Sequence, residues 1–261
     1  VLFADVRHYD KENGVRYFSN SGTHATYFAG ASEDFRENLK NVSLLPALFN
    51  TVIMTLLSLL LAVPLGVGGA IYLAEYANRS SRIVKAVRLT AETLAGIPSI
   101  LYGLFGMMFF VTSLRWSYSL LAGGMTLAVM ILPLILRTTE EALLSVPDSY
   151  REGSFGLGAG RLRTVTHIVL PPAMSGILAG VILAIGRVVG ETAALIYTAG
   201  TVADWPKGVM SSGRTLAVHM YVLSGEGLHV SEASATAVVL LVIVVGMNAL
   251  SAFAAKKLTR G

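Results

Sequence analysis

Two charged residues, Arg187 and Glu191, lie inside the apolar stretch ILAIGRVVGETAALIY at residues 182–197. An ionised side chain at the centre of a membrane costs about 2.5–3.5 kcal/mol, and such residues usually face a bundle interior or a wet cavity. Four residues of separation would place the two on one face of a continuous helix. An arginine guanidinium binds an oxyanion through paired hydrogen bonds. We therefore expect Arg187 to attract an anion and Glu191 to pair with Arg187 when no anion is bound. A structural ion pair between helices is the alternative.

Other polar residues near apolar stretches are weaker candidates. Arg88 and Glu92 repeat the four-residue spacing, but near a membrane interface an arginine can reach water by extending its side chain. Ser99 and Thr192 could line a path, although hydroxyls in spanning helices mostly bond to backbone carbonyls. The 5 histidines form no ligand spacing, so we expect no metal and no cofactor.

The composition indicates a membrane protein. The chain is 54% hydrophobic and 14% charged, whereas soluble domains have about 45–50% apolar and about 25% charged residues. It has 0 cysteines, which excludes a disulfide framework and thiolate metal sites. The net charge of +4 is typical of basic cytoplasmic loops. No basic run with interleaved aromatics points to nucleic acid.

Apolar runs, free of charged residues except for Arg187 and Glu191, are long enough to span a bilayer, which needs about 20 residues. The sequence thus predicts an all-α, polytopic transmembrane helical bundle with about five spans in residues 47–255. A further helix upstream of Val1, making six, would explain how the polar residues 1–46 reach the outside. The predicted spans are residues 47–73, 96–114, 119–136, 173–199 and 233–255.

Lysine and arginine gather in three segments that five spans would place on one side of the membrane: residues 74–90, residues 137–171 and the tail 256–261. Because basic loops stay in the cytoplasm, we expect these segments there and residues 1–46 outside.

Residues 137–171, which we call the coupling elbow, have the pattern of two short helices joined by glycines. Pro147 and Asp148 suit the first turn of a helix. Gly156, Gly158 and Gly160 then interrupt it, and a second helix leads through Pro171 into the next span. A helix–glycine–helix unit exposed in the cytoplasm could bind another protein.

The coupling elbow resembles the cytoplasmic signature of permease subunits of ABC importers. That signature is Glu-Ala-Ala, three residues, Gly, nine residues, then Ile-x-Leu-Pro. This chain has Glu152-Gly153-Ser154, then Gly158, and nine residues later Ile168-Val169-Leu170-Pro171. The spacing matches throughout, with Gly-Ser in place of Ala-Ala.

Three further stretches resemble the permeases of Pst-type phosphate importers, more the A subunit than the C subunit. The resemblance covers about residues 47–255 and implies a type I ABC importer permease in the inner membrane. It implies a second homologous permease, two copies of an ATP-binding subunit and an external phosphate-binding protein. It also gives Glu152, Gly158 and Pro171 the role of binding the ATPase, and gives Arg187 and Glu191 a place in the pore. The stretches are AGIPSILYGLFG (95–106), LPLILRTTEEALLSVPDSYREGSFGLGA (132–159) and GVILAIGRVVGETAALIYTAG (180–200).

The function implied is a permease subunit of an ATP-driven importer of inorganic phosphate. The chain has no phosphate-binding G-x-x-x-x-G-K-[ST] motif and no catalytic set, so we expect no enzyme activity and ATP hydrolysis in a separate subunit. Two alternatives remain: a permease for another oxyanion, such as sulfate or molybdate, or a transporter or channel without an ATPase.

Overall fold

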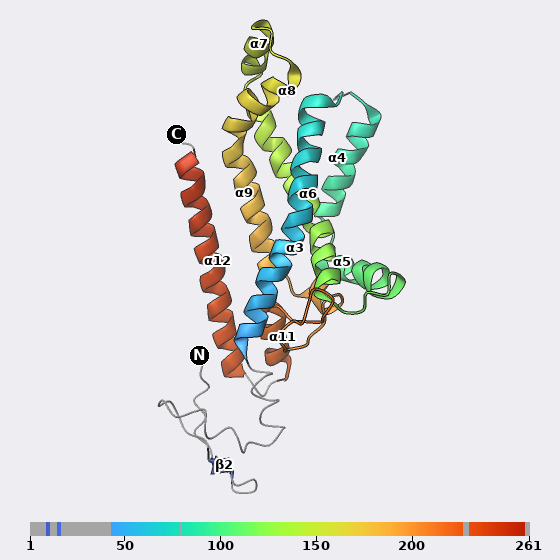
Figure 1. Cartoon of the computed structure of the whole chain (residues 1–261), viewed down its shortest axis with the longest axis vertical. Coiled ribbons are helices and arrows are strands. Elements are labelled where there is room, and N and C mark those ends of the chain that lie inside the picture. Colours follow the sequence, from blue (N-terminus) through green and yellow to red (C-terminus); the bar gives the residue numbers. More distant parts are fainter. Residues whose placement is uncertain (1–8, 11–14, 17–42, 79, 227–229, 259–261) are drawn as a thin grey trace.

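The structure, a computed structural model, describes residues 9–10, 15–16, 43–78, 80–226 and 230–258. Long helices run along the longest axis of the molecule, and short helices lie at both ends (Figure 1). The exception among these residues is an antiparallel pairing of β1 (Tyr9–Asp10) with β2 (Val15–Arg16). The prediction of an all-α bundle is confirmed. Most of the predicted external segment 1–46 lies outside the described residues.

The helices follow one another with few long connections. The order begins α3 (Leu44–Ile71), the π-helical turn η2 (Tyr72–Tyr76), α4 (Arg82–Ala95), α5 (Ser99–Gly106), the π-helical η3 (Met107–Ser113) and α6 (Leu120–Leu144). It continues α7 (Asp148–Gly156), α8 (Arg161–Thr164), the π-helical η4 (Val165–Val169), α9 (Leu170–Val189), α10 (Ala193–Ile196), α11 (Leu216–Glu226) and α12 (Val230–Leu258).

Among the described residues, 4 unbroken helices are long and apolar enough to cross a membrane. A fifth candidate consists of α4 followed by α5 and η3, two pieces bent by 101° relative to each other. The predicted number of about five spans is therefore confirmed only if the bent pair is counted. The unbroken helices are Leu44–Tyr76, Leu120–Leu144, Arg161–Val189 and Val230–Met247.

The predicted span over residues 96–114 is helical from Ser99 to Ser113, but this segment qualifies as a candidate span only together with α4, from which it is bent by 101°. Gly96 caps α4, and Pro98 occupies the cap position of α5. Proline has no backbone N–H and disfavours a helical conformation in the residue before it. The chain therefore turns between the two helices. Arg82, Lys85 and Arg88, which we expected in a basic loop, instead belong to α4.

The centre of the bundle is α6, against which α3, α4, α5 and α9 pack. Its side chains Leu127, Ile131 and Ile135 are completely buried. By contrast, the outer face of α3 exposes large apolar side chains, among them Leu56 and Leu60. A face of this kind is stable in lipid, because lipid tails are as apolar as leucine.

The connections between the helices lie at the two ends of the bundle. The elbow end holds the turn between η2 and α4, the helices α7 and α8, and the end of α12 (Figure 1). The opposite end holds the start of α3, the region of α11 and the start of α12. The helix α6 continues to Leu144, so the first part of the coupling elbow belongs to α6. The described parts of all three basic segments therefore lie toward the elbow end.

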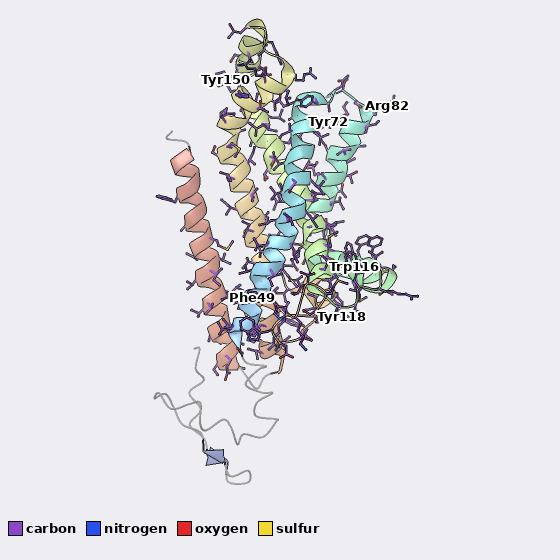
Figure 2. The ribbon with its side chains drawn as sticks, viewed as in Figure 1. Phe49, Tyr72, Arg82, Trp116, Tyr118 and Tyr150 are labelled. Atoms are coloured by element: carbon purple, nitrogen blue, oxygen red, sulfur yellow. The ribbon has the colours of Figure 1, made fainter. Side chains whose placement is uncertain are left out.

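Aromatic side chains mark both ends of the bundle. Tyr72 and Tyr150 lie toward the elbow end, whereas Phe49, Trp116 and Tyr118 lie toward the opposite end (Figure 2). Aromatic rings that are apolar on one side and polar on the other are enriched at both membrane–water interfaces. Their positions fit a bundle that crosses a bilayer along its longest axis.

Candidate functional site

The helix that carries Arg187 ends before Glu191. The last residue of α9 is Val189, and Gly190 caps the helix by donating its N–H to the Gly186 carbonyl at 3.2 Å. The prediction of a continuous helix over residues 173–199 is therefore wrong. Arg187 and Glu191 do not share a helix face, and the ion pairs of the described residues do not join them.

Each of these two charges is instead stabilised by a helix end. Arg187 lies in the last turn of α9, where the carbonyl groups carry partial negative charge. Glu191 is 8% exposed, and its Oε1 accepts a hydrogen bond from the Ala194 N–H of α10 at 3.1 Å. A carboxylate at the start of a helix satisfies a backbone donor that would otherwise lack a partner. Arg187 is half-buried and therefore accessible to an anion.

The remaining candidates around Arg187 lie where α5 packs on α10. A Cβ on Gly103 of α5 would lie 2.7 Å from the Ala194 Cα, so the two backbones touch. Ser99 begins α5, and Thr192 precedes α10; both are half-buried. The structure thus places these two hydroxyls on the two helices that meet beside the end of α9.

Tyr102 belongs to the same region, and sequence reasoning missed it. Its hydroxyl donates to the Leu94 carbonyl at 2.7 Å, across the bend between α4 and α5. Its ring shares an apolar cluster with Val188, the residue after Arg187 in α9. The sequence signal was its position one helical turn after Ser99, which puts both on one face of α5.

Arg88 and Glu92 lie elsewhere, in the middle and the last turn of α4. Arg88 Nη2 is 2.6 Å from Glu140 Oε1 of α6. Glu92 is 3.5 Å from Arg137, which also pairs with Glu141 at 3.0 Å. These residues line a cavity of about 250 Å³ between α4 and α6. Carboxylates outnumber guanidinium groups there, which favours a structural role over anion binding.

The coupling elbow has the geometry of two helical arms at an angle. The first arm, α7, ends at Gly156, and Gly158 then adopts a φ of +83°, a conformation that glycine tolerates best. Ser154 Oγ of the first arm lies 2.8 Å from Thr164 Oγ1 of the second, and both side chains are buried. Ser154 occupies a signature position where alanine is usual, and here its hydroxyl joins the two arms.

A groove of about 700 Å³ runs between the two arms. Gly158 and Ile168 line it, whereas Glu152 is exposed on α7. Leu170 and Pro171 lie beyond the groove at the start of α9, which follows η4 without a break. Leu157 at the tip is 91% exposed. The full lining is Ser149, Tyr150, Gly153, Ser154, Leu157, Gly158, Ala159, Arg163, His167 and Ile168.

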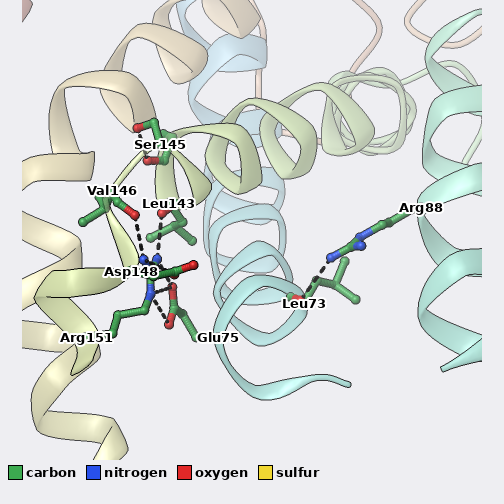
Figure 3. A network of polar contacts seen from close by, with 9 residues as sticks. Leu73, Glu75, Arg88, Leu143, Ser145, Val146, Asp148 and Arg151 are labelled. Carbon is green, nitrogen blue, oxygen red and sulfur yellow. Dashed lines mark hydrogen bonds and ion pairs between the residues drawn. The ribbon is translucent and has the colours of Figure 1, made fainter. Parts of the chain in front are cut away.

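Sequence reasoning also missed Arg151, which is the centre of a hydrogen-bond network at the base of the coupling elbow (Figure 3). Its Nη2 is 2.7 Å from Glu75 Oε1 of η2, and its Nε is 3.2 Å from both carboxylate oxygens. The hydrogen bond to Glu75 raises the pKa of Arg151 above its ordinary value, so the guanidinium stays charged at every physiological pH. Sequence gave no signal, because the partners are 76 positions apart.

The matching family model is the binding-protein-dependent transport system inner membrane component, and it covers residues 62–261. The chain belongs to this family. The match includes the broken span, the coupling elbow and the α9–α10 region with Arg187. Membership in an inner-membrane transport family confirms the predicted multi-pass membrane location and favours transport over catalysis.

Within this family, the chain is similar to named permease proteins. The chain is 37% identical over 194 residues to the probable ABC transporter permease protein YqgI of Bacillus subtilis, covering 69% of this chain and 66% of that protein. It is 40% identical over 154 residues to the phosphate transport system permease protein PstA 1 of Mycobacterium tuberculosis, covering 59% of this chain and 50% of that protein. The matches thus span between half and two thirds of these relatives.

Solved structures show the same fold. A chain in an inward-facing structure of the MetNI methionine ABC transporter matches with a TM-score of 0.65 and 20% identity. The match covers 87% of this chain and 99% of that one. The predicted ABC importer permease fold is thereby confirmed; at this identity the likeness concerns fold alone.

Proposed function

We propose that this chain is the membrane permease subunit of an ATP-driven importer of inorganic phosphate. The observation that carries this proposal is its 40% identity to a phosphate transport system permease. The accessible guanidinium of Arg187 at the end of α9 agrees with it, because a planar fork of donors suits a phosphate oxyanion.

Arg187 would hold phosphate only transiently. A half-buried guanidinium is partly hydrated, so exchanging water for an anion yields a modest net gain. Glu191 is bound to the α10 backbone, so it would not compete for Arg187; it would instead keep the local field from becoming strongly positive. Both effects favour release as well as binding, which transport requires.

The partners follow from family membership and from the coupling elbow. The groove beside Gly158 would receive an ATP-binding subunit, two copies of which would serve this chain and a second, homologous permease. An external binding protein would deliver phosphate to the opposite end. In this arrangement the elbow end and the tail 256–261 face the cytoplasm and residues 1–46 lie outside, as basic loops on the inner side require.

The substrate can be tested by measuring uptake of labelled phosphate in vesicles that contain the complete complex. Unlabelled phosphate should abolish uptake of the label, whereas equal concentrations of sulfate or molybdate should leave it unchanged. Competition by sulfate at equal concentration would assign the chain to another oxyanion.

The requirement for an ATPase can be tested separately. The chain, purified in mild detergent with its neighbouring gene products, should retain an ATP-binding subunit, and uptake should stop when ATP is removed. Uptake that continues without ATP or without a bound ATPase would support a secondary transporter or channel instead.

A further inference from the structure

The base of the coupling elbow touches a distorted turn of the first span. In η2 the hydrogen bonds reach one residue further than in an α-helix: the Ala77 N–H donates to the Tyr72 carbonyl at 2.9 Å. Turns of this kind are rare and often lie at functional sites.

The helix α7 is attached to the rest of the protein by polar contacts. Its buried residues are Arg151 and Ser154. The hydrophobic cluster at this end comprises side chains from η2, α6, η4 and α9, including Ala74 and Leu143, but includes no residue of α7. Apolar contacts are non-directional and allow sliding, whereas hydrogen bonds fix both distance and angle.

Arg151 uses every nitrogen of its guanidinium. Besides its bonds to Glu75, its Nη1 donates to the Val146 carbonyl at 2.7 Å and to Asp148 at 3.1 Å, and its Nη2 donates to the Leu143 carbonyl at 2.9 Å. The side chains of Arg151 and Glu75 are only 11% and 7% exposed. A charge-assisted, two-oxygen contact in such a site holds a fixed geometry.

On its other side, η2 is contacted by α4. The Leu73 carbonyl accepts a long hydrogen bond of 3.4 Å from Arg88 Nη2 (Figure 3), and Arg88 is paired with Glu140 of α6. The Tyr102 hydroxyl donates to the Leu94 carbonyl across the bend at the end of α4, and Tyr102 shares an apolar cluster with Val188, the residue after Arg187 in α9. Contacts therefore lead from α7 through η2 and α4 to the last turn of α9.

We propose that Arg151 and Glu75 form a rigid link through which movement of α7 displaces η2 and, with it, the first span. Arg151 and Glu75 are thus positioning residues: they touch no substrate. The proposal rests on the proposed function, in which an ATPase moves the coupling elbow. A purely stabilising ion pair is the alternative, since buried pairs often contribute little beyond an apolar substitute.

The test compares Glu75→Gln and Arg151→Lys with the control Glu141→Gln, all within the complete transporter complex. Glu141 also pairs with an arginine, at 3.0 Å, but on an exposed surface. Phosphate transported per ATP hydrolysed is measured for each variant. We expect both link variants to assemble and hydrolyse ATP while this ratio falls about tenfold, within the range of known coupling effects. Glu141→Gln should leave the ratio unchanged.

A second readout does not depend on the substrate. The chain has 0 cysteines, so spin labels can be attached through Tyr72→Cys on η2 and Phe155→Cys on α7. In the otherwise unchanged complex, the distance between the labels should stay constant when ATP binds. In Glu75→Gln it should change or broaden, because α7 then moves without η2.

The outcomes separate cleanly. If transport and assembly of the complex fall together while the phosphate transported per ATP hydrolysed is unchanged, the Arg151–Glu75 pair is structural and the proposal is overturned. An unaltered label distance in Glu75→Gln with ATP would overturn it as well. If the complex carries no phosphate, the proposed function fails while the label distances still decide whether the link exists.

Discussion

The Nη2 atom of Arg88 lies 2.6 Å from Oε1 of Glu140, but the two side chains differ in burial, at 32% and 10% exposed. Removing one partner of a buried pair leaves an uncompensated charge. The carboxylate cannot reach water easily, whereas the arginine can extend its side chain toward it.

Arg88→Leu should therefore destabilise the protein more than Glu140→Leu does. We expect Arg88→Leu to approach the cost of breaking a buried pair, about 3–5 kcal/mol, and the double variant to recover most of it. Thermal unfolding of the detergent-solubilised proteins compares the stability of the two single variants and the double variant. Equal losses in the two single variants would show that both charges are equally solvated.

Gly158→Val tests the role of the coupling elbow in binding an ATPase. The φ of +83° at this position costs a side chain with a Cβ about 1–2 kcal/mol, although no atom lies within 4 Å of the added Cβ. The strain would be relieved by rotating the arms, which reshapes the groove. The ATP-binding subunit should then copurify in much lower yield.

The matched control is Gly156→Ala. Its added methyl group also meets nothing within 4 Å, and its backbone is helical; alanine there should stabilise α7 by about 1 kcal/mol. ATPase copurification should be unchanged. Normal copurification with Gly158→Val would mean that the ATPase binds elsewhere.

Much of the fold could be predicted because long apolar runs have a single physical solution in a membrane. A run such as residues 120–136 must form a helix, since every backbone group needs an internal partner. The breaks between α4 and α5 and between α9 and α10 were harder to predict, because each depends on one or two residues. Gly190 and the Gly96–Pro98 turn are helix-stopping signals, but the long apolar run that contains each of them favoured a continuous span.

The candidate site was predictable only in part. Arg187 stands out as a lone cation in an apolar stretch, and one-dimensional reasoning finds it. Its neighbour Tyr102 depends on α5 packing against α10, and the link between Arg151 and Glu75 depends on two segments meeting from far apart in sequence. Contacts of this kind follow from the packing of the bundle, which periodicity does not encode.

Glu191 offers a test of its role as a helix cap. Glu191→Ala removes the acceptor for the Ala194 N–H and should destabilise the protein by about 1 kcal/mol, the usual cost of losing a cap. Glu191→Gln keeps an oxygen acceptor and should unfold at nearly the wild-type temperature. A large loss of stability with glutamine would show that the charge itself, and not the acceptor, matters.

Arg187→Gln tests the anion site most directly. The substitution keeps a hydrogen-bonding amide but removes the charge, so phosphate loses a charge-assisted interaction of about 1.5–3 kcal/mol. Uptake should fall about 10- to 150-fold on the same scale, while the complex still assembles and hydrolyses ATP. Arg187→Lys should retain part of the uptake, since it keeps the charge but not the planar fork. If Arg187→Gln fails to assemble while Arg187→Lys assembles and transports normally, the positive charge serves to hold the end of α9 in place and another residue binds the anion.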